Sequence, residues 1–75
     1  MGKSKHIVKV MFPDAESKRR LETQLGEMAI GFGCVDIPDI NKSKQGYYEF
    51  GDKESKKRFT NQVEQVYSDN IKGVY

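Results

Sequence analysis

The sequence predicts a small α+β domain in which a strand–helix–strand unit occurs twice. Residues 12–25 (FPDAESKRRLETQL) and 50–63 (FGDKESKKRFTNQV) align without a gap at an offset of 38 residues, with seven of 14 positions identical. A stretch with period-two apolar alternation comes before each segment, and apolar residues at helical spacing occur within and after it. Because 75 residues provide one domain only, we expect both units to share a single core.

The first strand is predicted over residues 6–12 (HIVKVMF), which alternate between two faces. The side chains of Val8, Val10 and Phe12 are expected to point inward. Those of Ile7, Lys9 and Met11 are expected to point outward. Pro13 ends this strand, and Asp14 is a favourable N-cap for the helix that follows. That helix is expected to bury a stripe at helical spacing and to end at Gly31 or Gly33. The stripe comprises Leu21, Leu25, Met28 and Phe32.

The next two strands are predicted in CVDIP (34–38) and YYEF (47–50), separated by the polar loop DINKSKQG (39–46). Because Pro38 has no N–H to donate, the first of these strands should be short or lie at a sheet edge. Period two places four side chains inward, Val35, Ile37, Tyr48 and Phe50. Outward we expect Cys34, Asp36, Tyr47 and Glu49.

The second helix is predicted after Asp52, with a buried stripe at i, i+4, i+7 and i+8. The stripe comprises Phe59, Val63, Val66 and Tyr67. Asn70 suits the left-handed conformation that closes a helix. IKGVY (71–75) then forms a last short strand, with Lys72 and Val74 expected on its outward face.

The element order βαββαβ predicts a ferredoxin-like sandwich built from two pseudo-symmetric βαβ halves. Both helices should cover one face of a four-stranded antiparallel sheet. Residues 1–5 are expected to be a flexible basic N-terminus and residues 6–75 a single ferredoxin-like domain, with the internal repeat spanning 6–40 and 45–75.

The repeated residues are mostly those that start a helix. Asp14 and Asp52 are expected to cap, while Phe12 and Phe50 close their strands inside the core. Glu16 with Arg20 and Glu54 with Arg58 are expected to form i,i+4 ion pairs, each worth about 0.3–0.5 kcal/mol. Helix N-termini also attract anions, so the repeat has a second interpretation as a duplicated anion site. The two helix starts should lie at opposite ends of the domain and could not share one ligand.

Composition excludes several classes of function. The net charge is +2, with acidic and basic residues interspersed, which does not by itself indicate nucleic acid. His6 and Cys34 are the only soft metal ligands, too few for a metal set, so neither metal nor cofactor is expected. A single cysteine forms no intrachain disulfide and favours a cytoplasmic protein. No phosphate-binding glycine loop and no convergent catalytic group is present, so we expect no enzyme.

The segment KSKQGYYEFGDKESKKRF (42–59) resembles the third strand and second helix of RNA-recognition-motif domains over about 18 residues. Gly46 and Tyr47 match the family's signature. Gln45 stands where the signature has a basic residue, Tyr48 where it has a small one, and Glu49 where it has the second stacking aromatic. The resemblance therefore implies a base-stacking role for Tyr47 alone.

The strand face away from the helices is the main candidate for binding. The expected partner-binding residues are Ile7, Lys9, Met11, Tyr47, Glu49 and Val74. Tyrosine and methionine are enriched in protein interfaces, whereas Lys, Asp and Glu could simply keep this face hydrated. The short edge strands offer another route, through addition of a partner strand.

We therefore expect a small non-enzymatic interaction module or regulator that binds a partner protein of unknown identity and could also self-associate as a homodimer. The alternative is an RNA- or single-stranded-DNA-binding domain. Its contacts would come from Lys9, Lys42, Lys44 and Tyr47, with the lysines contacting phosphates.

Overall fold

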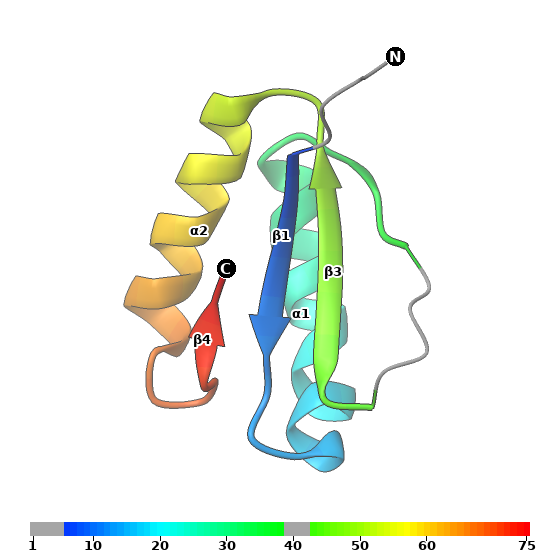
Figure 1. The fold of residues 1–75 in the computed structure, drawn as a ribbon, viewed down its shortest axis with the longest axis vertical. Coiled ribbons are helices and arrows are strands. Elements are labelled where there is room, and N and C mark those ends of the chain that lie inside the picture. Colours follow the sequence, from blue (N-terminus) through cyan, green and yellow to red (C-terminus); the bar gives the residue numbers. More distant parts are fainter. Residues whose placement is uncertain (1–5, 39–42) are drawn as a thin grey trace.

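The computed structural model describes residues 6–38 and 43–75, and their elements follow the predicted order (Figure 1). The elements are β1 (His6–Met11), α1 (Ala15–Gly31), β2 (Cys34–Asp36), β3 (Gln45–Phe50), α2 (Lys53–Tyr67) and β4 (Gly73–Val74). The predicted N-terminal segment 1–5 and part of the polar loop, 39–42, lie outside the described residues.

The four strands form one antiparallel sheet in the order β2-β3-β1-β4, and both helices pack against the same face (Figure 1). The predicted α+β architecture of two helices and a four-stranded antiparallel sheet is thus confirmed. It is compatible with a ferredoxin-like fold. The two short strands β2 and β4 occupy the edges, as Pro38 and the brevity of IKGVY indicated.

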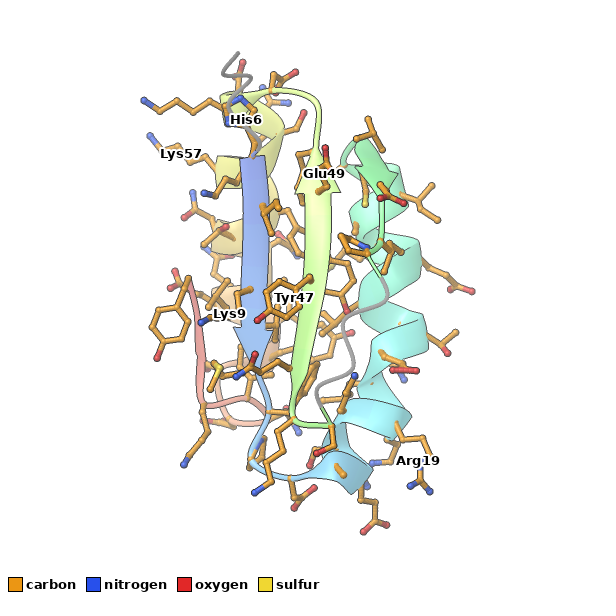
Figure 2. All side chains as sticks on the ribbon, turned by 45° about the vertical axis from the view of Figure 1, so that its right-hand side comes forward. His6, Lys9, Arg19, Tyr47, Glu49 and Lys57 are labelled. Atoms are coloured by element: carbon orange, nitrogen blue, oxygen red, sulfur yellow. The ribbon has the colours of Figure 1, made fainter. Side chains whose placement is uncertain are left out.

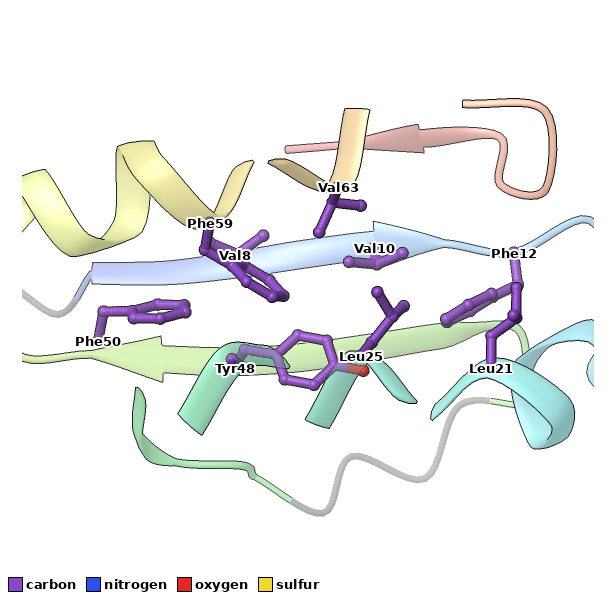
Figure 3. Packing of buried hydrophobic residues seen from close by; sticks show 10 residues of the cluster. Val8, Val10, Phe12, Leu21, Leu25, Tyr48, Phe50, Phe59 and Val63 are labelled. Atoms are coloured by element: carbon purple, nitrogen blue, oxygen red, sulfur yellow. The ribbon is translucent and has the colours of Figure 1, made fainter. Parts of the chain in front are cut away.

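The core lies between the sheet and the helices, where the alternation of β1 and β3 directs its larger apolar side chains (Figure 3). The buried hydrophobic residues are Val8, Val10, Phe12, Leu21, Leu25, Ala29, Tyr48, Phe50, Phe59 and Val63. The inward assignment of both central strands, including Phe12 and Phe50 at the ends of their alternations, is confirmed.

Phe59 of α2 is fully buried and sits at the centre of this core. Its ring centroid lies 5.1 Å from that of Phe50, 5.3 Å from that of Tyr48 and 6.3 Å from that of Phe32. These distances fall in the range in which tilted and edge-on aromatic pairs attract one another. Phe59 therefore joins β3 to both helices.

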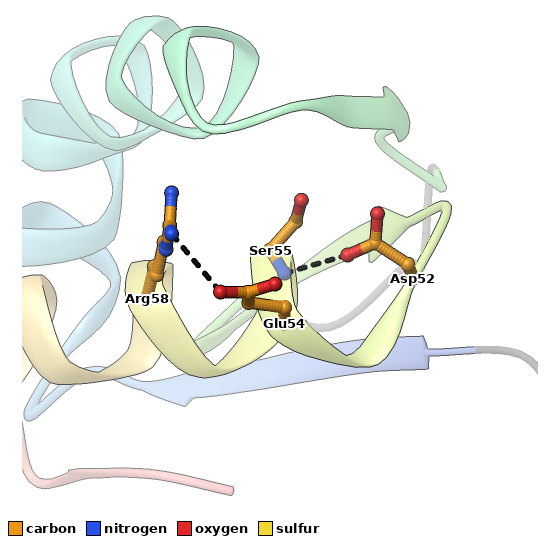
Figure 4. A network of polar contacts seen from close by, with 4 residues as sticks. All are labelled: Asp52, Glu54, Ser55 and Arg58. Carbon is orange, nitrogen blue, oxygen red and sulfur yellow. Dashed lines mark hydrogen bonds and ion pairs between the residues drawn. The ribbon is translucent and has the colours of Figure 1, made fainter.

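The two repeated aspartates cap their helices in the same way. Asp14 Oδ1 accepts a hydrogen bond from the Ser17 N–H at 2.7 Å. Asp52 Oδ1 accepts one from the Ser55 N–H, also at 2.7 Å (Figure 4). The hydrogen bonds from Ser17 lower the pKa of Asp14, and those from Ser55 lower the pKa of Asp52. The repeated Asp-x-x-Ser spacing is thus explained by helix initiation.

Only one of the two predicted ion pairs forms. Arg58 Nη2 lies 3.0 Å from Glu54 Oε2 on the exposed surface of α2 (Figure 4), where such a pair contributes little. No ion pair joins Glu16 and Arg20, so that prediction is wrong. The charge of Arg20 instead contributes to lowering the pKa of Asp14.

The predicted faces of the β2 segment hold for Ile37, which faces α1 near Gly26 although it is 46% exposed. They are wrong for two residues: Cys34 packs against the core, and Val35 is 63% exposed. The cause is a register shift: Cys34 pairs with Phe50 and Asp36 with Glu49, so two steps along β2 match one step along β3. Such a bulge displaces the period-two alternation. Asp36 keeps its expected outward position.

The helix stripes also differ in detail from the prediction. Val66 is 52% exposed because α2 packs through Phe59, Val63 and Tyr67, a straight i, i+4, i+8 row that leaves Val66 to one side. On α1, Ala29 is fully buried, while the predicted Met28 and Phe32 are only partly buried.

The helix ends are formed differently from one another. α1 runs to Gly31, and Gly33 then takes φ 101°, the left-handed conformation that glycine adopts without strain. No described non-glycine residue has a positive φ, so the left-handed conformation predicted for Asn70 is wrong. α2 instead ends at Tyr67, and its C-cap Ser68 stays in the right-handed helical region.

Replacing Phe59 with alanine should lower the free energy of unfolding by about 3–5 kcal/mol, because it empties the space between three rings. Val66→Ala, on the same helix but half exposed, is the matched control and should change it by less than about 0.5 kcal/mol. Urea unfolding followed by circular dichroism measures both. Equal effects of the two changes would contradict the assigned face of α2.

The capping aspartates should make stability depend on pH in the acid range. Because the folded-state pKa of each lies below the ordinary 3.8, their stabilisation is complete above that value and is lost as pH falls through the folded pKa. Asn keeps the cap but does not titrate. The double variant Asp14→Asn, Asp52→Asn should therefore lose less stability between neutral pH and about pH 2 than the parent in urea titrations. If both proteins lose the same free energy of unfolding between neutral pH and about pH 2, other carboxylates cause the loss.

Candidate binding surface on the open sheet face

The face of the sheet opposite the helices carries the candidate site, and no described element lies over it (Figure 2). We call it the open face. It is formed by Ile7, Lys9, Met11, Asp36, Gln45, Tyr47, Glu49 and Tyr75. The side chains of β1 and β3 on this face are all half-buried by their neighbours. Their assignment follows from pairing, since residues directly opposite in a sheet point to the same side.

Lys9 stands at the centre of the open face between two tyrosines. Tyr47 is its cross-strand partner on β3, and the Lys9 ammonium lies 5.5 Å from the ring centroid of Tyr75 on the other side. This distance permits a cation–π attraction. The Tyr47 hydroxyl donates a 2.6 Å hydrogen bond to Gln45 Oε1, which orients its ring (Figure 2 shows Tyr47 beside Lys9).

Tyr75 and Gln45 are the residues of this surface that the sequence prediction missed, Gln45 because it was assigned to the polar loop before β3. Tyr75 belongs to the end of the last strand. Its N–H donates to the Lys9 carbonyl oxygen at 2.7 Å, which extends the β4 pairing by one residue. Its ring lies beside Gly73, where an added Cβ would sit 3.2 Å from the Tyr75 hydroxyl oxygen. A glycine two residues earlier on the same strand face therefore leaves room for this ring. That spacing is the signal that could have identified it.

Two residues expected on the open face lie on the core side instead. Val74 pairs with the inward Val10 and packs against the core, so its placement among the partner-binding residues is corrected. A one-residue change of register inverts every side chain of a strand, and β4 is too short to define its own register. Cys34 moves inward through the bulge in β2.

Of the lysines expected to contact phosphate, the structure describes Lys9 and Lys44 and places them at different sites. Lys42 lies outside the described residues. Lys44 is exposed, and its charge contributes to lowering the pKa of Asp14 at the start of α1. Lys72, expected on the outward face of the last strand, is exposed in the turn before β4, where its N–H donates to the Met11 carbonyl oxygen. Among these lysines, Lys9 is the one that the described structure places on the open face.

A groove of about 510 Å³ runs between α1 and β3, and Gln45 and Tyr47 of the open face are among its lining residues. Its lining includes Glu22, Gly26, Ile30, Ile37, Gln45 and Tyr48. Ile37 approaches Gly26 closely, with its Cδ1 3.6 Å from where a glycine Cβ would lie. Burial raises the pKa of Tyr48, with the nearby Glu22 charge adding to the effect, so the hydroxyl stays protonated at neutral pH. Tyr48 therefore does not act as a tyrosinate base at neutral pH.

The two soft ligands of the chain have β3 between them, because His6 and Cys34 each pair with Phe50 from opposite sides. His6 starts β1, and Cys34 donates a 3.2 Å hydrogen bond from Sγ to the Asp36 carbonyl oxygen. Within residues 6–38 and 43–75, no three His, Cys, Asp or Glu side chains are grouped closely enough to hold a metal ion. Among the helices of those residues, none has the length and apolar character required to span a membrane.

Comparison of the chain with protein-family models, with curated proteins and with solved structures finds no match.

Proposed function

We propose that this protein is a small non-catalytic binding module, a ferredoxin-like domain with two pseudo-symmetric halves that binds a partner protein through its open face. The observation that carries the proposal is the composition of that face. Ile7, Met11, Tyr47 and Tyr75 supply apolar and aromatic contact area around Lys9, and tyrosine and methionine are residue types enriched in protein interfaces. Tyr75 is 66% exposed, so its ring has surface left to bury.

The acidic residues of the open face favour a protein partner over nucleic acid. Glu49 and Asp36 pair with one another across β3 and β2, next to the Ile7 end of the face. Two carboxylates there would repel a phosphate backbone, whereas a protein can meet them with basic side chains. The edge strands β2 and β4 provide a second route, because each presents backbone groups to a partner strand.

A single-stranded nucleic acid is the second candidate, favoured by one observation. Tyr47 and Tyr75 flank Lys9 on the open face, so two bases could stack on the rings while the ammonium contacts phosphate. This interpretation predicts binding of a mixed RNA or DNA oligonucleotide pool that weakens steeply with salt and is reduced by Tyr47→Ala and Tyr75→Ala. Fluorescence anisotropy at low salt measures it, and undetectable binding there would exclude it.

The test of the main proposal is capture of the partner by tagged protein from native lysate, with and without nuclease, followed by mass spectrometry. Met11→Asp and Tyr47→Asp should each reduce capture of a stoichiometric protein at least about tenfold, because a buried, unpaired carboxylate is costly. Val66→Asp places the same group on an exposed position of α2 and is the matched control.

Circular dichroism and thermal melts establish that these variants remain folded. Capture that survives both open-face substitutions would show that the partner uses another surface. If nuclease treatment removes the captured proteins, the ligand of the domain is nucleic acid and not a protein.

A further inference from the structure

The centre of the open face carries a self-complementary pattern of four residues. Ile7 pairs with Glu49, and Lys9 pairs with Tyr47, so these side chains form a two-by-two block across β1 and β3. One diagonal of the block carries the opposite charges of Lys9 and Glu49, and the other carries Ile7 and Tyr47. Figure 2 shows Lys9, Tyr47 and Glu49 together on this face.

We infer that the partner of the open face is a second copy of this chain, bound face to face in a symmetric dimer; this inference rests on the proposed function and specifies its partner. A twofold axis lying in the interface along the Ile7–Tyr47 diagonal exchanges the positions of Lys9 and Glu49. Each Lys9 then lies over the Glu49 of the other copy. Tyr47 and Ile7, which lie on the axis, meet their own counterparts.

The spacing of a β-sheet fits this arrangement. Neighbouring strands lie about 4.8 Å apart and alternate residues about 6.8 Å apart, so the block is a rectangle slightly longer along the strands. Rotation about its diagonal makes the strands of the two copies cross steeply, as in orthogonal packing of two sheets. Because of the twofold symmetry, the contact between Lys9 of one copy and Glu49 of the other occurs twice in the interface.

The electrostatic state of the single chain supports the same partner. Glu49 is half-buried and makes no ion pair or side-chain hydrogen bond with any residue of the described chain. Lys9 is held toward Tyr75 by the cation–π contact rather than by a carboxylate. Each charge therefore remains available to an opposite charge from outside, and the Lys9–Glu49 diagonal carries no net charge to drive two copies apart.

The test is a charge exchange, read by sedimentation equilibrium from micromolar to millimolar protein. Lys9→Glu and Glu49→Lys should each weaken self-association by about tenfold or more, because each places like charges opposite one another twice. The double variant Lys9→Glu, Glu49→Lys restores both pairs and should dimerise like the parent. An equimolar mixture of the two single variants should form a heterodimer, since both glutamates of the first variant then face lysines of the second.

Arg19→Glu and Glu64→Lys make the same changes of charge on exposed helix positions and should leave self-association unchanged. Circular dichroism confirms the fold of each variant. A parent that stays monomeric at millimolar concentration overturns the inference, as does a dimer that responds to the control substitutions but not to the charge exchange. The proposed function is tested separately. If the chain is monomeric but still captures a different protein in a Tyr47-dependent way, the binding function of the open face stands. If the chain neither self-associates nor captures another protein through Tyr47, the proposed function is wrong as well.

Discussion

The antiparallel register between β1 and β3 determines which side chains of this domain are buried and which are presented to solvent. Val8 pairs with Tyr48 and points inward, while Lys9 pairs with Tyr47 and points outward. Because side chains alternate with period two, a slip of one residue would bury a lysine and expose the core valines. On the inward side, the ring of Phe59 contacts both inward aromatic residues of β3 and so stabilises the orientation of that strand.

The sequence was most informative where several weak signals coincide on long elements. The two helices and the faces of β1 and β3 were predictable, since apolar periodicity, an Asp N-cap and the 38-residue repeat agree there. The inward Phe12 and Phe50 follow from the same agreement. The structure also accounts for the repeat, because Asp14 and Asp52 each cap a helix by accepting a hydrogen bond from the N–H of the serine three residues later.

The edge strands could not be predicted as well, because their geometry is imposed by their neighbours. β2 has three residues and β4 has two, too few for an alternation to specify a face. The bulge that turns Cys34 inward and Val35 outward is visible only in its pairing with β3. The same limitation hid Tyr75, whose position depends on the Val10–Val74 register and whose ring uses the space beside Gly73.

The outward residues of the two halves differ, and that difference gives the open face its character. At the repeat offset of 38, Lys9 corresponds to Tyr47 and Met11 to Glu49, whereas Phe12 and Phe50 are identical. The requirements of helix initiation and core packing act on both halves alike, but they do not act on side chains that point away from the core. A lysine stands on β1 and a glutamate on β3, diagonal to one another across the central strand pair. Matching charges at these two positions would make the face repel its own copy. The opposite charges of Lys9 and Glu49 therefore make association through this face electrostatically possible. The caps at Asp14 and Asp52 and the buried Phe12 and Phe50 support it in the same way at both helix starts.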